Sequence, residues 1–237
     1  MTDRGPQQAP ALLVDVGGVL LLHNHELLAP ITARYGGVSD RAGFQRAHYG
    51  AHNQSLPARG PAVDYFSVFP SHAGIPEAHR EAFEAEYRAY HQTRNMCHWP
   101  DPNAKHTLRT LKDEGVPIAV VSQADGTIVQ MLREAQMCQE GEGPGVSVDA
   151  ILDSAVVGYD KPDPRLFLAA LERIGAEPAR AVHVGDTVYA DVMGARAAGI
   201  LPLHYDPFDD CDDRADHDHI RHLGEVRPYL ERVTTTA

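Results

Sequence analysis

Hydrophobic residues along this chain follow two successive patterns. A short apolar run at residues 12–14, stopped by Gly17-Gly18, predicts a buried strand. From residue 23 to residue 100, apolar residues recur at the spacing of helix faces. From Asp101 onward, short apolar runs alternate with helical patterns. The chain therefore divides into a helical block and a block of alternating strands and helices.

The helical block, residues 23–100, carries helix patterns without a strand pattern. We expect its helices to begin near Leu27, at Ser39 or Asp40, at Pro61 and at Pro76. The last of them runs to about Thr93, and the chain then returns through residues 96–100. We interpret this block as a small helical domain inserted after the first strand.

The second block predicts a parallel sheet. Apolar runs indicate further strands at residues 117–121, 150–153, 181–184 and 200–203. Helical patterns lie between them, including one at residues 187–198, and a Gly- and Glu-rich stretch at 139–145 predicts an exposed loop. Strands joined by crossover helices form a parallel sheet covered on both faces. We therefore predict an α/β fold, a doubly wound Rossmann-like core built from residues 11–22 and 101–237.

Composition narrows the class of protein. The chain has 237 residues, of which 43% are hydrophobic, enough for a sizeable core, and its net charge of −12 argues against non-specific binding to nucleic acid or to anionic membranes. Cys97, Cys138 and Cys211 lie far apart, as is typical of a reduced cytosolic protein. Residues 1–10 lack the apolar core of a signal peptide, and no apolar run approaches the ~20 residues of a membrane span. We expect a soluble cytoplasmic protein of unknown oligomeric state.

Reactive side chains recur where the predicted strands end. Asp15 follows the first strand, Ser122 the second and Asp186 the fourth. Lys161 lies in the loop after the third strand, and Asp191 lies one turn into the last helix. Each residue alone fits a turn, a cap or a solvated position. Because ligands bind beyond the carboxyl ends of parallel strands, we expect the set to converge into an active site.

These residues and their order resemble the four motifs of the haloacid dehalogenase superfamily, a large group of aspartate-nucleophile phosphohydrolases. The resemblance implies that Asp15 is the nucleophile at the end of the first strand. Ser122, with the neighbouring Gln123, matches the motif that holds the phosphoryl group. Lys161 matches the lysine that balances charge at the nucleophile. A carboxylate can attack phosphorus only when the negative charge on both partners is offset, and Lys161 is suited to that task.

The resemblance also implies a metal and a substrate class. Asp186 and Asp191 match the acidic pair that holds Mg²⁺, together with Asp15 and the backbone carbonyl of Gly17. Residues 23–100 look like the family's helical cap domain, which closes over the site. We therefore expect hydrolysis of a small phosphorylated metabolite through an aspartyl-phosphate intermediate at Asp15.

Gly17 departs from the family's pattern. Most phosphatases of the superfamily carry a second Asp there as general acid and base, and loss of such an acid costs about 10²–10⁴-fold. Carbon–halogen hydrolysis, or a catalytically weakened binding or regulatory protein, are therefore the alternatives. Dehalogenases lack this Asp too, but they do not need the metal site that Asp186 and Asp191 indicate. The acidic pair favours a phosphatase.

Two histidine-containing stretches carry open questions. His23 and His25 follow the first motif, and one of them could replace the missing acid, although we expect a hinge with exposed imidazoles. Residues 206–222 are rich in Asp and His and could bind a divalent metal. Their spacing matches no calcium-loop or zinc pattern, so we interpret the segment as a solvated acidic loop.

Overall fold

The structure is a computed structural model that describes residues 9–56, 61–93, 97–211 and 216–235. Its central sheet has six parallel strands in the order β10-β9-β8-β1-β4-β7. The strands are β1 (Ala11–Val14), β4 (Ile118–Ser122), β7 (Ala150–Asp153), β8 (Ala181–Gly185), β9 (Leu201–Tyr205) and β10 (Asp218–Ile220). The predicted α/β fold is confirmed, and β10 adds a strand that the sequence pattern did not predict.

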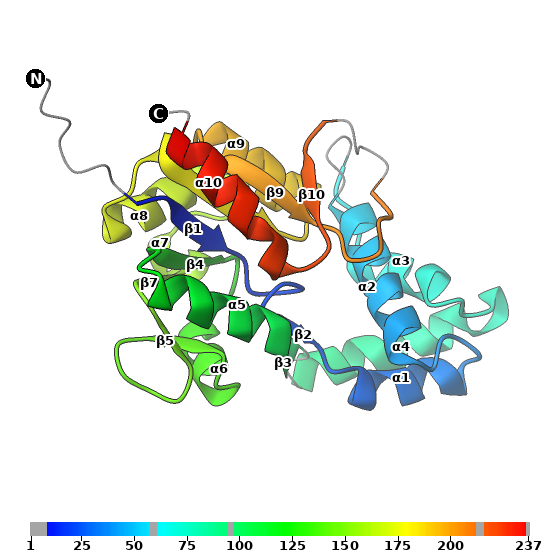
Figure 1. Ribbon diagram of the computed structural model, residues 1–237. Coiled ribbons are helices and arrows are strands. Elements are labelled where there is room, and N and C mark those ends of the chain that lie inside the picture. The colour runs from blue at the N-terminus through cyan, green and yellow to red at the C-terminus, as the bar shows by residue number, and fades with distance from the viewer. Residues whose placement is uncertain (1–8, 57–60, 94–96, 212–215, 236–237) are drawn as a thin grey trace, which may run out of the picture.

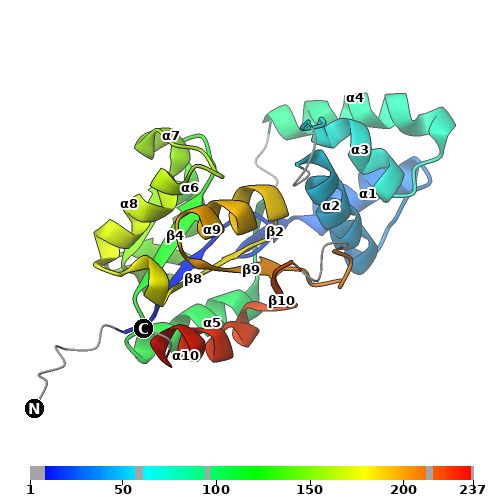
Figure 2. The same ribbon diagram turned by 90° about the horizontal axis from the view of Figure 1, so that it is seen from above.

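Helices cover both faces of the sheet, with α5 and α10 on one side and α8 and α9 on the other (Figure 2). Alternate residues of a strand face opposite sides, so Leu12 and Val14 pack in one apolar core and Leu13 in the other. Burial on both faces explains why β1 is apolar throughout. The helices of this lobe are α5 (Pro102–Asp113), α6 (Ile128–Glu134), α7 (Ser154–Val157), α8 (Pro164–Ile174), α9 (Met193–Ala197) and α10 (Arg227–Thr235), with short 3-10 turns at Pro178–Arg180 and Leu223–Val226.

A second lobe of helices lies beside the sheet (Figure 1). It consists of α1 (His25–Arg34), α2 (Arg41–Ser55), α3 (Tyr65–His72) and α4 (Glu77–Thr93). These helices enclose an apolar core of their own, in which Phe69 and Phe83 stack on Tyr87 with ring centroids 4.8 and 5.0 Å apart. The predicted helical block therefore folds as a separate layer.

The third helix of this lobe begins later than its sequence suggests. We expected Pro61 to open it, but α3 begins at Tyr65, and residues 61–64 are not helical. The carboxylate of Asp64 accepts a hydrogen bond from the backbone N–H of Ser67 at 3.1 Å. This cap satisfies a helix-end donor and fixes the start of the helix, so the prediction from Pro61 was wrong.

Two short strands join the lobes where no strand was predicted. β2 (Leu21–His23) pairs antiparallel with β3 (Cys97–Pro100), so the expectation of a block without strands is corrected. β3 is partly exposed and forms through backbone pairing with β2 rather than through burial. No long apolar run therefore marks it in the sequence. Met96, in the predicted return segment, lies outside the described residues.

Two predictions in the second block also need correction. Gln139, expected in an exposed loop, is buried, and its side-chain Oε1 accepts a hydrogen bond from the N–H of Gly145 at 2.8 Å. The residues around it form β5 (Cys138–Glu140) and β6 (Val146–Val148), a separate parallel pair. The helix expected at residues 187–198 begins with a π-helical turn, η2 (Val188–Val192), and continues as α9.

The segment after β9 is less solvated than expected. Asp206 is buried, and β10 pairs with β9. Asp212 and Asp213 of that segment lie outside the described residues, as do residues 1–8.

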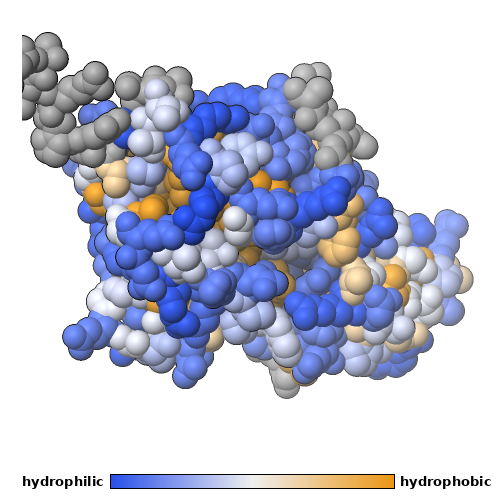
Figure 3. All heavy atoms as spheres, viewed as in Figure 1, coloured by the Kyte–Doolittle hydropathy of each residue, from blue (hydrophilic) through white to orange (hydrophobic). Residues whose placement is uncertain are grey.

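Hydrophilic residues dominate the face of the molecule drawn in Figure 3. Within the described ranges, no helix is both long enough and apolar enough to cross a membrane.

Candidate active site

The predicted site residues meet at one edge of the sheet. β1 lies between β4 and β8, where the direction of the chain's crossovers reverses, and ligands of α/β sheets bind at such points. A pocket of about 620 Å³ opens there. Its walls include Asp15, Gly17, Ser122, Gln123, Lys161 and Asp186.

Lys161 joins two carboxylates. Its buried ammonium donates to Oδ1 of Asp15 at 2.6 Å and to Oδ1 of Asp191 at 2.7 Å. Burial by itself lowers the pKa of Lys161, but the two carboxylates outweigh burial and hold that pKa above its ordinary value. Lys161 is therefore a fixed positive charge beside Asp15 at neutral pH.

Asp191 lies behind the pocket wall. Its Oδ1 accepts from Lys161 and lies 3.0 Å from Nε2 of His183, while its Oδ2 accepts from the N–H and the hydroxyl of Thr187 at 3.1 and 2.7 Å. The π-helical turn η2 folds the side chain back onto Thr187. Gly185 permits this approach, because a Cβ there would overlap the carboxylate of Asp191. Hydrogen-bond donors of the protein therefore occupy both carboxylate oxygens of Asp191.

The acidic groups carry more charge than Lys161 offsets. One carboxylate oxygen from each of Asp15, Asp186 and Asp191 lies within 4.8 Å of the other two, and all three residues are buried. Burial raises the pKa of Asp15 to about 7; Lys161 opposes this rise, and the charges of Asp191 and Asp186 add to it. Surplus buried negative charge on oxygen donors fits Mg²⁺.

Comparison with known proteins identifies the family. Residues 10–199 match the family model of haloacid dehalogenase-like hydrolases. The chain belongs to that family. This hydrolase is 33% identical over 167 residues to haloacid dehalogenase-like hydrolase domain-containing protein 3 of Bos taurus, an alignment that covers 66% of this chain and 63% of the relative.

A second relative is named as a phosphatase. The hydrolase is 34% identical over 111 residues to ribulose-1,5-bisphosphate 5-phosphatase of Halopiger xanaduensis, covering 47% of this chain and 44% of the relative. Both alignments thus span less than two thirds of the relative's length. The crystal structure of a HAD phosphatase from Thermococcus onnurineus superposes with a TM-score of 0.55 over 93% of this chain and 97% of that one. At 22% identity this likeness shows the fold alone.

In this hydrolase, α2 reaches over the loops that follow β1 and β8. Tyr49 donates its hydroxyl to the carbonyl of Gly18 at 2.5 Å, and the side-chain amide of Asn53 donates to the carbonyl of Asp186 at 3.2 Å. Nδ1 of His52 lies 3.4 Å from Oδ2 of Asp186, and His52 lines the same pocket as Asp15. Sequence reasoning missed these residues, because no motif marks them; their spacing along one helix was the available signal.

The neighbouring glycines Gly17 and Gly18 have different roles. Gly18 has a φ of +73°, and a Cβ there would overlap the carboxylate of Asp186. Gly17 has no positive φ, and a Cβ there would meet nothing within 4 Å. The loop therefore requires glycine at position 18 and tolerates a side chain at position 17.

We expect Gly18→Ala to destabilise the fold and Gly17→Ala to leave it nearly unchanged. The left-handed backbone alone costs Gly18→Ala about 1–2 kcal/mol, and the overlap with Asp186 adds to this. Urea unfolding of both variants measures the difference. Equal unfolding free energies for the two variants would contradict this description of the loop.

His23 and His25 do not line the pocket. His23 is buried against His48, with ring centroids 3.8 Å apart, so the expectation of an exposed imidazole at this position is wrong. Burial lowers the pKa of His23 to about 3, with smaller contributions from His91, His52 and His98. A neutral ring at that depth is a poor proton donor.

We expect His23 to make the fold sensitive to acid. The unfolded chain binds a proton at His23 below its ordinary pKa of 6.5 and the folded chain does not, so stability falls as pH falls from 6.5 toward 3. Between pH 7 and pH 5 the loss from this group is about 2 kcal/mol. Urea unfolding at both pH values should show a smaller loss for His23→Gln than for His222→Gln, a change at an exposed histidine. The same loss in both variants would rule out this role.

Proposed function

We propose that this hydrolase is a magnesium-dependent phosphatase that acts on a small phosphorylated metabolite through Asp15. The observation that carries the proposal is the buried contact of Asp15 with Lys161, in one pocket with the carboxylate of Asp186. A dehalogenase with the same nucleophile does not need the metal site that Asp186 would help to form. A relative named as a phosphatase of a sugar bisphosphate supports the same substrate class.

The residues of the pocket supply each step of the reaction. The carboxylate of Asp15 attacks phosphorus while the bond to the leaving oxygen breaks, which forms an acyl phosphate on Asp15. Lys161 offsets the negative charge of carboxylate and phosphoryl group, and Ser122 and Gln123 bind the phosphoryl oxygens. Water then attacks phosphorus, which releases phosphate and restores Asp15.

The acidic set divides into metal ligands and a positioning residue. Asp15, the backbone carbonyl of Gly17 and Asp186 would hold Mg²⁺, which when bound offsets charge on the phosphoryl oxygens. Asp191 was predicted as a further ligand, but four protein groups already surround its oxygens, as many as a carboxylate accommodates. We therefore assign Asp191 to holding Lys161 in place beside Asp15.

Gly17 has no proton to give the leaving group, and we propose that His52 supplies it. His52 lines the pocket, 3.4 Å from Asp186. An imidazole that lines the pocket can act as a general acid near neutral pH.

The size of the pocket supports a small substrate. Its volume of about 620 Å³ lies within the range of small-molecule sites, roughly 300–1,000 Å³. His52 and Leu56 form part of its wall, so the helical lobe contributes to substrate choice as a cap. We propose that residues 23–100 act as this cap domain.

Phosphate release from a panel of phosphorylated metabolites, with and without magnesium, tests the proposed function. We expect at least one substrate to be hydrolysed, EDTA to reduce the rate at least about tenfold, and added Mg²⁺ to restore it. Full activity in excess EDTA would contradict the metal site. Metal-independent halide release from 2-haloacids would instead support a dehalogenase. No turnover of either the phosphorylated metabolites or the 2-haloacids would support a binding protein.

A further inference from the structure

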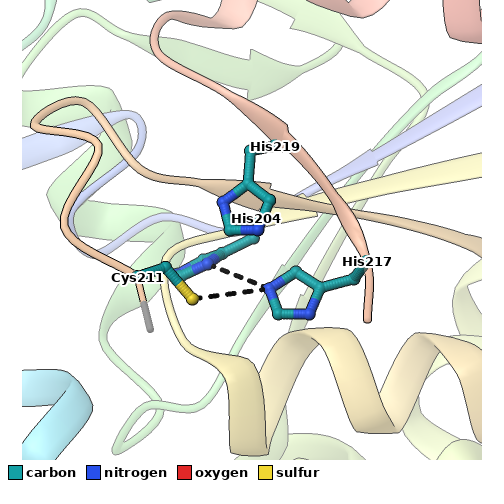
Figure 4. A group of neighbouring side chains, drawn as sticks. All are labelled: His204, Cys211, His217 and His219. Atoms are coloured by element: carbon teal, nitrogen blue, oxygen red, sulfur yellow. Dashed lines mark hydrogen bonds between the residues drawn. The ribbon is translucent and has the colours of Figure 1, made fainter. Parts of the chain in front are cut away.

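A second cluster of metal-binding side chains lies outside the proposed active site (Figure 4). His204 belongs to β9, Cys211 lies in the segment that follows, and His217 and His219 lie just before and within β10. One ligand atom from each of the four residues lies within 4.8 Å of all the others. The parallel pairing of β9 with β10 brings these groups together.

Two distances inside the cluster match those of a tetrahedral metal site. Nε2 of His217 lies 3.3 Å from Nδ1 of His204 and 3.8 Å from Sγ of Cys211. Zinc bonds of about 2.0–2.3 Å at tetrahedral angles hold neighbouring ligand atoms about 3.3–3.8 Å apart. Figure 4 shows the same nitrogen of His217 turned toward both partners. Imidazole with thiolate is a donor set that suits zinc rather than magnesium.

Neighbouring groups already orient these ligands. Nε2 of His204 donates to the backbone carbonyl of Asp186 at 3.2 Å, which leaves Nδ1 directed at the cluster. Asp206 accepts a hydrogen bond from the N–H of Cys211 at 3.1 Å and lies 3.4 Å from Nδ1 of His219. Such carbonyl and carboxylate partners fix the rings of metal-binding histidines.

The cluster is buried yet reachable from solvent. The side chains of His204 and His217 are almost fully buried. Cys211 and His204 also line a cavity of about 810 Å³ beside α2, which gives an ion a path to the site.

We propose that His204, Cys211, His217 and His219 bind one Zn²⁺ ion with a structural role. Four protein ligands close a tetrahedral site and leave no position for a substrate. The ion would tie Cys211 to β9 and β10, and the neighbouring Asp210 pairs with Arg46 of α2 at 2.5 Å. This inference shares no ligand with the magnesium site and does not depend on the proposed function.

Metal binding by the purified protein tests the site. Chelator-stripped, reduced protein in excess Mg²⁺ should bind one Zn²⁺ per chain with a Kd below about 1 µM. Co²⁺ in its place should give a sulfur-to-metal charge-transfer band, which an all-oxygen site cannot produce. Cys211→Ser should lose this band, and His217→Gln should weaken zinc binding at least about tenfold. His222→Gln, a change at an exposed histidine just after β10, should bind zinc like the wild type.

Two results would overturn the inference. One is wild-type protein that binds less than one Zn²⁺ under these conditions or shows no thiolate band with Co²⁺. The other comes from alkylation of the wild-type protein, which requires no variant. Zinc should slow alkylation of Cys211 at least about tenfold, as measured on its peptide by mass spectrometry, and leave alkylation of Cys97 unchanged. An unchanged rate at Cys211 would exclude the thiolate as a ligand.

Discussion

Asp15→Asn should abolish phosphate release and leave the fold intact. An amide cannot form the acyl phosphate, so kcat should fall by at least about 10³-fold. The substitution is nearly isosteric, and Lys161 keeps the carboxylate of Asp191 as a partner at 2.7 Å. Initial rates on the best substrate of the phosphate panel give the activity, and circular dichroism with thermal unfolding gives the state of the fold.

Asp113→Asn is the matched control for this variant. Asp113 is exposed at the end of α5 and does not line the pocket, so its substitution should leave the rate unchanged. A folded Asp15→Asn protein that retains more than a few per cent of wild-type activity would contradict the assignment of Asp15 as the nucleophile.

His52→Gln should impair alkyl phosphates far more than aryl or acyl phosphates. An alkoxide leaves slowly unless it is protonated, so loss of a general acid should lower alkyl phosphate turnover by about 10²–10⁴-fold. Leaving groups of low pKa depart without a proton, and their turnover should change little. Rates on one alkyl and one aryl phosphate in wild type and variant measure the ratio.

Gly17→Asp should restore the lost activity in the His52→Gln background. Position 17 has room for a side chain, and an Asp there has the place that the family's general acid takes. Gly17→Asn is the matched control, since it fills the same space without an acidic proton. Equal losses on alkyl and aryl phosphates in His52→Gln would show that His52 positions the loop through Asp186 and donates no proton.

Much of the fold could be predicted because buried parallel strands carry continuous apolar runs. The run at residues 150–153 coincides with β7, and Asp15 and Asp186 stand where β1 and β8 end. Strand ends of one parallel sheet meet at one edge, so positions far apart along the chain converged as expected.

The remaining features depend on partners distant in sequence. β3 is partly exposed and forms through pairing with β2, which no local pattern records. His52 reaches Asp186 across 134 positions, and its approach depends on how α2 lies over the loop. The sequence offered residues 206–222 as a possible metal site, and three residues of the histidine–cysteine cluster lie there, but β9 supplies the fourth, His204, from outside that stretch. Motif spacing detects ligands only when they lie close along the chain.

Trapping of the covalent intermediate tests the central claim most directly. Wild-type protein mixed with acetyl phosphate and Mg²⁺, then quenched in acid, should yield one peptide heavier by a single phosphoryl group, with the added mass on Asp15. The Asp15→Asn protein should yield none. Phosphate release by wild type with an unmodified Asp15 peptide, or with the phosphoryl group on another residue, would contradict the account.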